Sequence, residues 1–304
     1  MFSKLVSLTL CLSASLAIGT IAQTRSIGFN TKILEDIIGV KGTINTEERV
    51  FKVSFPRTDI PVTVDGWPMK PFMGLTSWAA FRKGVEKESM VMGDLVLFED
   101  EVNPVMSVAL DNGLSVTALH NHFFYDKPKV YFMHIGGDGG FQTFATAIKK
   151  TQDKVREIRA ANPQPVAGFP GAPLPAESNI DGKEVEQIVG HSGQANGGMF
   201  KIVIGRSATM PCGCEARKEM GINTWAAFAG SADNAFVDGD FAVLESELQS
   251  VLSTLRAGGM NIVAIHHHMT DEKPRYLFLH YWGKGPAKQL AQVIKSGLEK
   301  TAHE

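Results

Sequence analysis

The stretch Leu75-Thr-Ser-Trp-Ala-Ala-Phe81 returns later in the chain as Ile222-Asn-Thr-Trp-Ala-Ala-Phe228, and this recurrence decides the fold. Further matches follow at constant spacing: Gly93-Asp94 with Gly239-Asp240, His120-Asn-His122 with His266-His-His268, Lys127-Pro128 with Lys273-Pro274, and His134 with His280. Self-similarity over such a length is typical of a duplicated structural unit. The sequence therefore predicts two homologous domains.

The domain boundaries follow from this repeat and from local composition. At 304 residues the chain exceeds the usual length of one domain. We expect a first repeat domain over residues 23–159 and a second over residues 180–304. Residues 160–179 between them are rich in proline and alanine, which predicts a semi-stiff linker with polyproline character.

The first 22 residues have the pattern of a signal peptide. Lys4 precedes a short apolar run, and small residues lead to Ala22, near which we expect cleavage. The apolar run is too short to span a bilayer as a stable helix. We therefore expect a periplasmic or secreted protein with no transmembrane segment after signal removal.

Composition narrows the class of partner. Hydrophobic residues make up 44% of the chain and charged residues 20%, which is ordinary for a globular protein. The formal net charge is -2, and the sequence has no basic stripe of the kind that binds phosphate backbones. A nucleic-acid partner is therefore not expected.

Hydrophobic periodicity predicts the same elements in both halves. Helical spacing of apolar residues occurs four times, twice in each half. The four stripes are Val102, Val105, Met106 and Ala109; Leu248, Val251, Leu252 and Leu255; Phe141, Phe144, Ala145 and Ile148; and Ala287, Leu290, Ala291 and Ile294. A further short helix is expected near residues 31–38 and again near 182–189.

The remaining apolar segments predict strands. We expect strands at residues 50–55, 78–81, 90–98, 114–122 and 129–134, with counterparts at 199–204, 225–228, 235–244, 260–268 and 275–281. The resulting class is α+β, with the order strand-strand-helix-strand-strand-helix, a mainly antiparallel sheet and helices on one face. Whether the two sheets join is left open by the sequence.

Each repeat carries a histidine triplet whose spacing suits a metal ion. Side chains alternate along a strand, so the two histidines of an H-x-H motif point the same way. If the following turn centres near Lys127, the third histidine falls opposite the first, on the same face. Three converging imidazoles match a zinc site with an open fourth position, and copper is the alternative. The predicted ligands are His120, His122, His134, His266, His268 and His280.

A structural interpretation competes with the metal site, because histidines also occur as satisfied polar residues on a sheet face. Two diverged copies nevertheless keep all three histidines while neighbours differ, such as Phe124 against Thr270. His267, which replaces Asn121 of the first copy, should face away from the cluster. We therefore favour a metal or catalytic role for at least one cluster.

Acidic residues recur near the triplets. Asp94 and Asp240 follow a glycine inside a strand, where a supporting role around the metal or in a turn is favoured over a ligand role. Glu101 and Glu247 begin a helix, where a carboxylate complements the helix dipole. All four are candidate catalytic residues if the protein is an enzyme.

Two further features differ in how far they repeat. Trp78 and Trp225 occupy equivalent positions in apolar strands and are expected in the core. Cys212 and Cys214 occur in the second copy alone, beside Met210 and Met220. In an exported protein they could form a disulfide, remain free thiols, or bind a soft metal such as copper(I).

The motifs resemble those of the LppY/LpqO family, a domain of unknown function (DUF1259). The resemblance is carried by Phe55-Pro-Arg-Thr-Asp59, Trp78-Ala-Ala-Phe81, Gly93-Asp94, His120-Asn-His122, Lys127-Pro128 and Phe132-Met-His134, and it covers nearly the whole mature chain. It implies an exported, tandem-domain protein, often a lipoprotein. This chain lacks a convincing lipobox, and its second copy has Ile204-Gly-Arg206 in place of Phe55-Pro-Arg57.

Three functional hypotheses remain. The leading one is an exported protein that binds a metal ion in two pseudo-equivalent sites, because no nucleophile motif stands beside the histidines. The second is a metal-dependent hydrolase or lyase acting on an unknown small molecule, with Asp94 or Glu101 as base. The third is a structural envelope module without metal.

Overall fold

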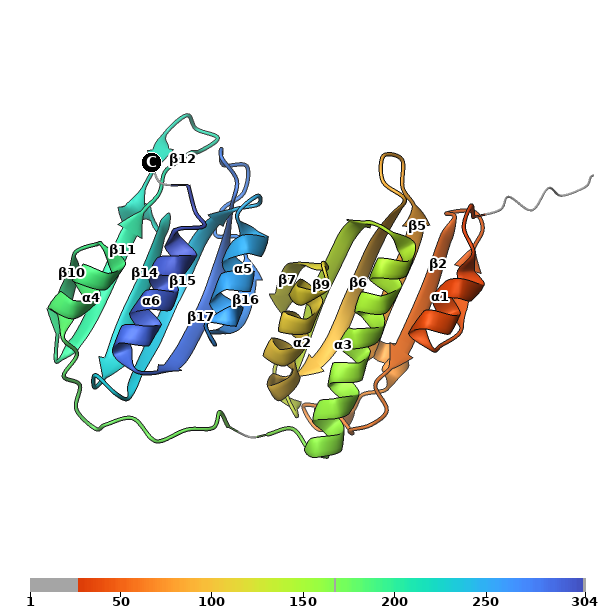
Figure 1. Cartoon of the computed structure of the whole chain (residues 1–304), viewed down its shortest axis with the longest axis horizontal. Helices are drawn as coiled ribbons and strands as arrows, with labels where there is room; N and C mark the ends of the chain where they lie inside the picture. The colour runs from red at the N-terminus through yellow and green to blue at the C-terminus, as the bar shows by residue number, and fades with distance from the viewer. Residues whose placement is uncertain (1–26, 167, 303–304) are drawn as a thin grey trace, which may run out of the picture.

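The computed structural model describes residues 27–166 and 168–302, so the predicted signal segment, residues 1–22, lies outside the described residues. Within that part of the chain, no helix is both long enough and apolar enough to cross a membrane. Two similar α+β units lie side by side, each with helices on one face of its strands (Figure 1).

The first repeat opens with a helix, which four strands follow before the next long helix. Its main elements are α1 (Thr31–Ile38), β1 (Gly42–Asn45), β2 (Val50–Pro56), β5 (Thr76–Lys83), β6 (Ser89–Phe98), α2 (Glu99–Asp111), β7 (Ser115–His120), β9 (Val130–Gly139) and α3 (Phe141–Ala161). Three short strands and a 3-10 helix lie in its loops: β3 (Thr63–Val64), β4 (Trp67–Pro68), η1 (Pro71–Met73) and β8 (Asp126–Lys127).

The second repeat follows the same order. Its main elements are α4 (Gly182–Val189), β10 (Gly193–Asn196), β11 (Met199–Gly205), β14 (Asn223–Gly230), β15 (Ala235–Leu244), α5 (Leu248–Ala257), β16 (Asn261–His266), β17 (Tyr276–Gly285) and α6 (Ala287–Leu298). Its loops contain β12 (Ala208–Thr209), β13 (Glu215–Ala216) and η2 (Lys218–Met220).

The two repeats share one sheet, which answers the question that the sequence left open. Twelve strands run in the order β1-β2-β5-β6-β9-β7-β16-β17-β15-β14-β11-β10. Neighbouring strands are antiparallel, and the repeats meet where Leu119 of β7 pairs with the equivalent residue Ile265 of β16. This joint between the repeats therefore relates equivalent strands by a pseudo-twofold axis.

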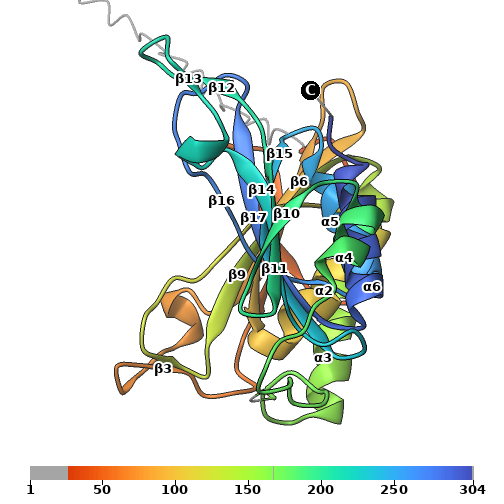
Figure 2. The same ribbon diagram turned by 90° about the vertical axis from the view of Figure 1, so that its left-hand side faces the viewer.

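The helices form one layer, on one face of this sheet (Figure 2). The four predicted apolar stripes all lie buried between helices and sheet, which confirms the helical periodicity. Short helix α1 ends at Gly39, and α4 ends at Gly190, both with positive φ that a residue without a Cβ adopts at little cost. Strand β1, which is mostly exposed, was not predicted because its residues lack an apolar pattern.

The other face of the sheet, here called the open face, carries no α-helix among the described residues (Figure 2). A loop region from each repeat packs onto part of it: the first flap, residues 57–75, and the second flap, residues 206–222. Each flap has its own small apolar cluster, distinct from the large core beneath the helices. The open face is where both histidine triplets lie.

Each flap is tied to the start of a helix by a buried ion pair. Arg57 contacts Glu101 at 2.7 Å, and the equivalent Arg206 contacts Glu247 at 2.6 Å. Both glutamates also accept a main-chain N–H close to the beginning of the helix, from Phe98 and Leu244 respectively. Their carboxylates are therefore satisfied by structural partners.

Candidate metal centre

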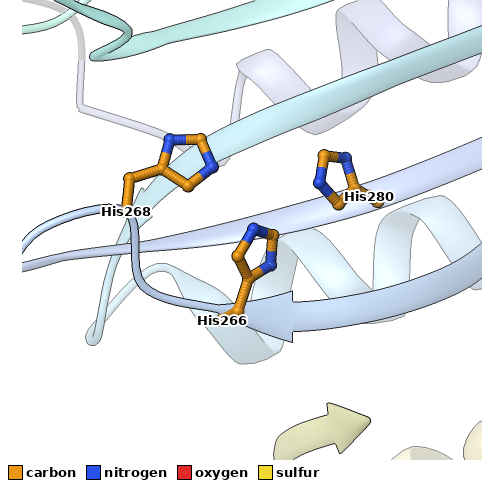
Figure 3. A group of neighbouring side chains, drawn as sticks. All are labelled: His266, His268 and His280. Atoms are coloured by element: carbon orange, nitrogen blue, oxygen red, sulfur yellow. The ribbon is translucent and has the colours of Figure 1, made fainter. Parts of the chain in front are cut away.

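The histidines of the second repeat converge at the end of strand β16. His266 is the last residue of that strand, His280 lies in the middle of the neighbouring strand β17, and His268 follows two residues after His266. One ligand nitrogen from each ring lies within 4.8 Å of the other two. Figure 3 shows the three rings turned toward a common space. This triplet could hold a metal ion.

The hairpin register differs from the expected one without destroying the site. His266 pairs with Phe278, and His280 with Ala264, so the third histidine does not lie directly opposite the first. A bulge between Ile262 and Ala264 precedes this pairing, and the turn centres closer to the first strand than predicted. The displacement is two residues. Because side chains alternate with a period of two, all three histidines stay on one face.

Strand β16 also ends earlier than predicted. His268 was expected inside the strand but lies beyond its end, where its ring stacks on Phe278 with centroids 3.5 Å apart and planes 8° apart. The intervening residue, His267, turns its Nδ1 to the main-chain oxygen of Tyr276 at 2.9 Å. Stacking on Phe278, rather than strand pairing, therefore orients the ring of His268.

Burial sets the protonation of the two histidines from β16 and the loop after it. Burial, aided by His280 and His268, lowers the pKa of His266 to about 4. Burial also lowers the pKa of His268, while a hydrogen bond with the main chain of Gly221 opposes that shift. A neutral imidazole is the form that binds a metal ion.

A buried carboxylate lies next to the triplet. Asp240 of β15 pairs with His280 of β17, and its Oδ2 lies 3.6 Å from Nε2 of His268 and 4.0 Å from Nδ1 of His280. Burial raises the pKa of Asp240 to about 6, although His280 opposes that shift. Asp240 was predicted to support the site rather than to bind metal, and these distances allow either role.

Two buried polar atoms at this site lack hydrogen-bond partners among the described residues. They are Oδ1 of Asp240 and Nδ1 of His266. Buried polar atoms without partners are rare in folded proteins because they lose hydration without compensation. Three imidazoles and one carboxylate are also a donor set that suits a divalent transition-metal ion.

The histidines of the first repeat have the same arrangement, but their ligand nitrogens are less closely gathered. The Nε2 atoms of His120 and His134 are 3.0 Å apart, and the ring of His122 stacks on Phe132 with centroids 3.4 Å apart. Asp94 pairs with His134, as Asp240 does with His280. Again the register is displaced by two residues, because His120 pairs with Phe132 and His134 with Ala118. Within the described ranges, the 4.8 Å gathering of three ligand atoms occurs in the second repeat alone.

The glutamate candidates have other partners. Glu101 is fully buried and contacts both Arg57 and Arg159, the latter at 3.0 Å. Arg206 lowers the pKa of Glu247 against the opposing effect of burial, which is the largest single influence. Both carboxylates are therefore held by arginines, and this agrees with the predicted role at the start of a helix better than with a catalytic one.

The prediction that the tryptophans belong to the core was wrong. Trp78 and Trp225 are half-buried on the open face, and a lysine ammonium lies 4.2 Å from the ring centroid of each, Lys52 in the first repeat and Lys201 in the second. An apolar strand pattern does not tell which face a residue takes when both faces are partly covered. The repeated lysine, two residues after Val50 and Met199, was the signal that was missed.

The two cysteines of the second flap are free and exposed. They lie in the turn between β12 and β13, where the main-chain N–H of Cys214 points to Sγ of Cys212 at 3.3 Å. A hydrogen bond from Cys214 lowers the pKa of the Cys212 thiol and raises that of Cys214. The two thiols are not joined by a disulfide in the structure, and the soft-metal site stays a prediction.

Comparisons with known proteins agree with the duplication. One family model, described as Domain of Unknown Function (DUF1259), matches residues 32–154 and again residues 183–300. No curated protein and no solved structure matches the chain. The two matched regions cover most of the sequence and coincide with the two repeats of the fold. The chain therefore belongs to the DUF1259 family, as a tandem pair of that domain.

Proposed function

We propose that this chain is an exported protein that binds a divalent transition-metal ion through His266, His268 and His280. The observation that carries this proposal is the convergence of one nitrogen from each ring within 4.8 Å. Zinc is the preferred ion because it takes imidazole ligands in tetrahedral geometry, and copper is the alternative. Asp240, whose Oδ2 lies 3.6 Å from His268, is the fourth ligand or the group that orients a ligand.

The first triplet is a second site of the same kind. Two imidazole Nε2 atoms at 3.0 Å form a hydrogen bond if one carries a proton and the other accepts it. Around zinc, nitrogens bonded at about 2.0–2.1 Å in tetrahedral directions lie about 3.3 Å apart. His120 and His134 therefore need only a small separation to hold an ion, with His122 as third ligand. We expect weaker binding there than in the second repeat.

Metal content of the untagged protein tests this proposal. After zinc exposure and desalting, elemental analysis should find at least one equivalent per chain, and His268→Ala should remove about one equivalent. His267→Ala is the matched control, because His267 is adjacent but turns to Tyr276. A wild-type protein that stays metal-free with both zinc and copper would contradict the proposal and leave a structural envelope module as the interpretation.

Export is the part of the proposal that rests on the sequence of residues 1–22, with its charged start, apolar run and small residues before Gln23. Expression of the full-length chain in a bacterial host, followed by cell fractionation and N-terminal sequencing, tests it. A mature N-terminus near Gln23 in the periplasm or medium is expected. An intact N-terminus in the cytoplasm would contradict it.

A metal-dependent hydrolase or lyase is the second candidate, and one observation favours it. A hollow of about 690 Å³ reaches Asp240 and His268 from the open face, so a small molecule has room beside the ion. A metal held there would activate water, and Asp240 is placed to accept a proton. Zinc-dependent cleavage of chromogenic esters or phosphate esters that Asp240→Asn abolishes would support this activity.

A further inference from the structure

The hollow beside the second triplet is built from residues of several elements. Its volume is about 690 Å³, which suits a small metabolite rather than a single water molecule. Strands β10, β11 and β14 form its floor and η2 of the second flap forms its rim. The polar and aromatic side chains that line it beside His268 are Ser192, Gln194, Lys201, Lys218, Glu219, Asn223, Trp225 and Asp240.

Strand register connects this hollow to the histidines. Trp225 of β14 pairs with Asp240 of β15, which in turn pairs with His280 of β17. Lys201 stands on the next strand outward, with its ammonium 4.2 Å from the centroid of the Trp225 ring. The Trp225 ring, the Asp240 carboxylate and the His280 imidazole therefore lie in this order across the open face. The Lys201 ammonium lies above the Trp225 ring.

The lysine ammonium is held in place without being neutralised. A cation over an indole face is attracted by the negative face of the ring, which favours one position of a long side chain. Among the described residues, no carboxylate forms an ion pair with Lys201 within 4.0 Å, whereas Lys218 has Glu219 at 3.8 Å. Since that pair is exposed, it weakens the charge of Lys218 little.

The balance of charge in the hollow favours an anion once a metal is bound. Two lysines and a divalent cation outweigh the two carboxylates on its lining, Asp240 and Glu219. A further carboxylate, Asp238, is exposed on the same strand as Asp240, two residues away, where solvent screens it. An ammonium group and an open metal position both attract carboxylate or phosphate oxygens.

The first repeat keeps one half of this arrangement and lacks the other. Lys52 lies over Trp78 at the same 4.2 Å, but the flap positions of Lys218 and Glu219 are taken by Pro71 and Phe72. Phe72 is fully exposed. The lysine over tryptophan therefore belongs to both copies, and the second cation belongs to the second repeat alone, which supplies a matched internal control.

We propose that this hollow binds a small organic or inorganic oxyanion, a carboxylate or a phosphate. One end of the anion lies at the metal held by His266, His268 and His280, and the other contacts the ammonium groups of Lys201 and Lys218. This inference rests on the proposed metal site. It deepens that proposal by naming the chemical class of the ligand.

Cobalt(II) in place of zinc makes both steps visible in one sample of the full chain. Absorption in the visible range reports that cobalt has bound to the histidines, and its intensity and position report a change of ligand. Acetate and inorganic phosphate are then titrated separately, at constant ionic strength, into the wild type, Lys201→Gln and Lys52→Gln. Each titration is normalised to the cobalt bound by that variant.

The expected result is a saturable shift of the cobalt band with at least one anion, and about tenfold weaker binding of it in Lys201→Gln, the cost of losing one charge-assisted hydrogen bond. Lys52→Gln should bind the anion as the wild type does. Normal cobalt binding without an anion response, or equal weakening by both substitutions, overturns the inference and leaves the metal site standing. Absence of the cobalt band overturns the metal site itself, and the inference with it.

Discussion

Two side-chain amides hold the joint between the repeats, and their removal should weaken the whole fold. Asn103 of α2 donates to the main-chain oxygen of Ile262 at 3.2 Å and accepts from its N–H at 2.8 Å. The equivalent residue Gln249 of α5 makes the same pair of bonds to Val116, at 2.8 and 2.9 Å. Each amide therefore makes the two main-chain hydrogen bonds that a neighbouring strand would otherwise make, beside the bulge of the other repeat.

The expected cost follows from the groups left without partners. Ile262 is 1% exposed and Val116 fully buried, so water cannot replace the lost bonds without opening the joint. A buried donor or acceptor without a partner costs about 1–3 kcal/mol. Asn103→Ala and Gln249→Ala each leave two such groups, so we expect each substitution to lower the free energy of unfolding by about 2–6 kcal/mol.

Urea unfolding followed by circular dichroism measures this change as a lower transition midpoint. Gln289→Ala, at an exposed position of α6, is the control for loss of a solvent-exposed amide. We expect it to stay within about 0.5 kcal/mol of the wild type. Losses of that small size for both Asn103→Ala and Gln249→Ala would refute the idea that the amides hold the joint.

Three further predictions concern single positions. Gly239→Ala would place a Cβ 2.2 Å from the hydroxyl oxygen of the buried Tyr281, so a melting temperature lower by several degrees is expected, and an unchanged one would contradict the packing. Thr224→Val removes a hydroxyl that accepts from a buried main-chain N–H at 3.0 Å, which should cost about 1–3 kcal/mol in urea unfolding. Glu247 has its pKa lowered by Arg206, so its contribution to stability is present above about pH 5 and fades as the pH falls through the lowered value. Glu247→Gln should therefore flatten the acid side of a stability–pH curve, and an unchanged slope would count against the pair.

Much of the fold could be predicted because local patterns determine it. The apolar stripes of the helices after β6 and β15 follow the 3.6-residue period, and every stripe residue is buried. The recurrence of His120 and His266 with their partners placed a triplet in each repeat. That all three rings share one face was also accessible, since it depends only on whether the register displacement is even.

Other features could not be predicted because they depend on long-range packing. The joint pairs Leu119 with Ile265, yet neither β7 nor β16 carries a local sequence pattern that identifies the other as its partner. The exact register depends on a bulge between Val116 and Ala118, and the sequence there has no pattern that predicts a bulge. The position of Trp225 depends on which face the helices cover, a property of the whole sheet.

The flaps carry a consequence for how such a protein can be changed. Each rests on its own small apolar cluster, centred in the second repeat on Ile222 and Phe278, rather than on the large core under the helices. The sequence of a loop anchored in this way can change while the sheet and its helices keep their stability. Replacing residues 57–75 with residues 206–222 should therefore place the lysine of η2, Lys218, beside the first histidine triplet. The duplicated chain already carries both flap sequences on the same α+β framework.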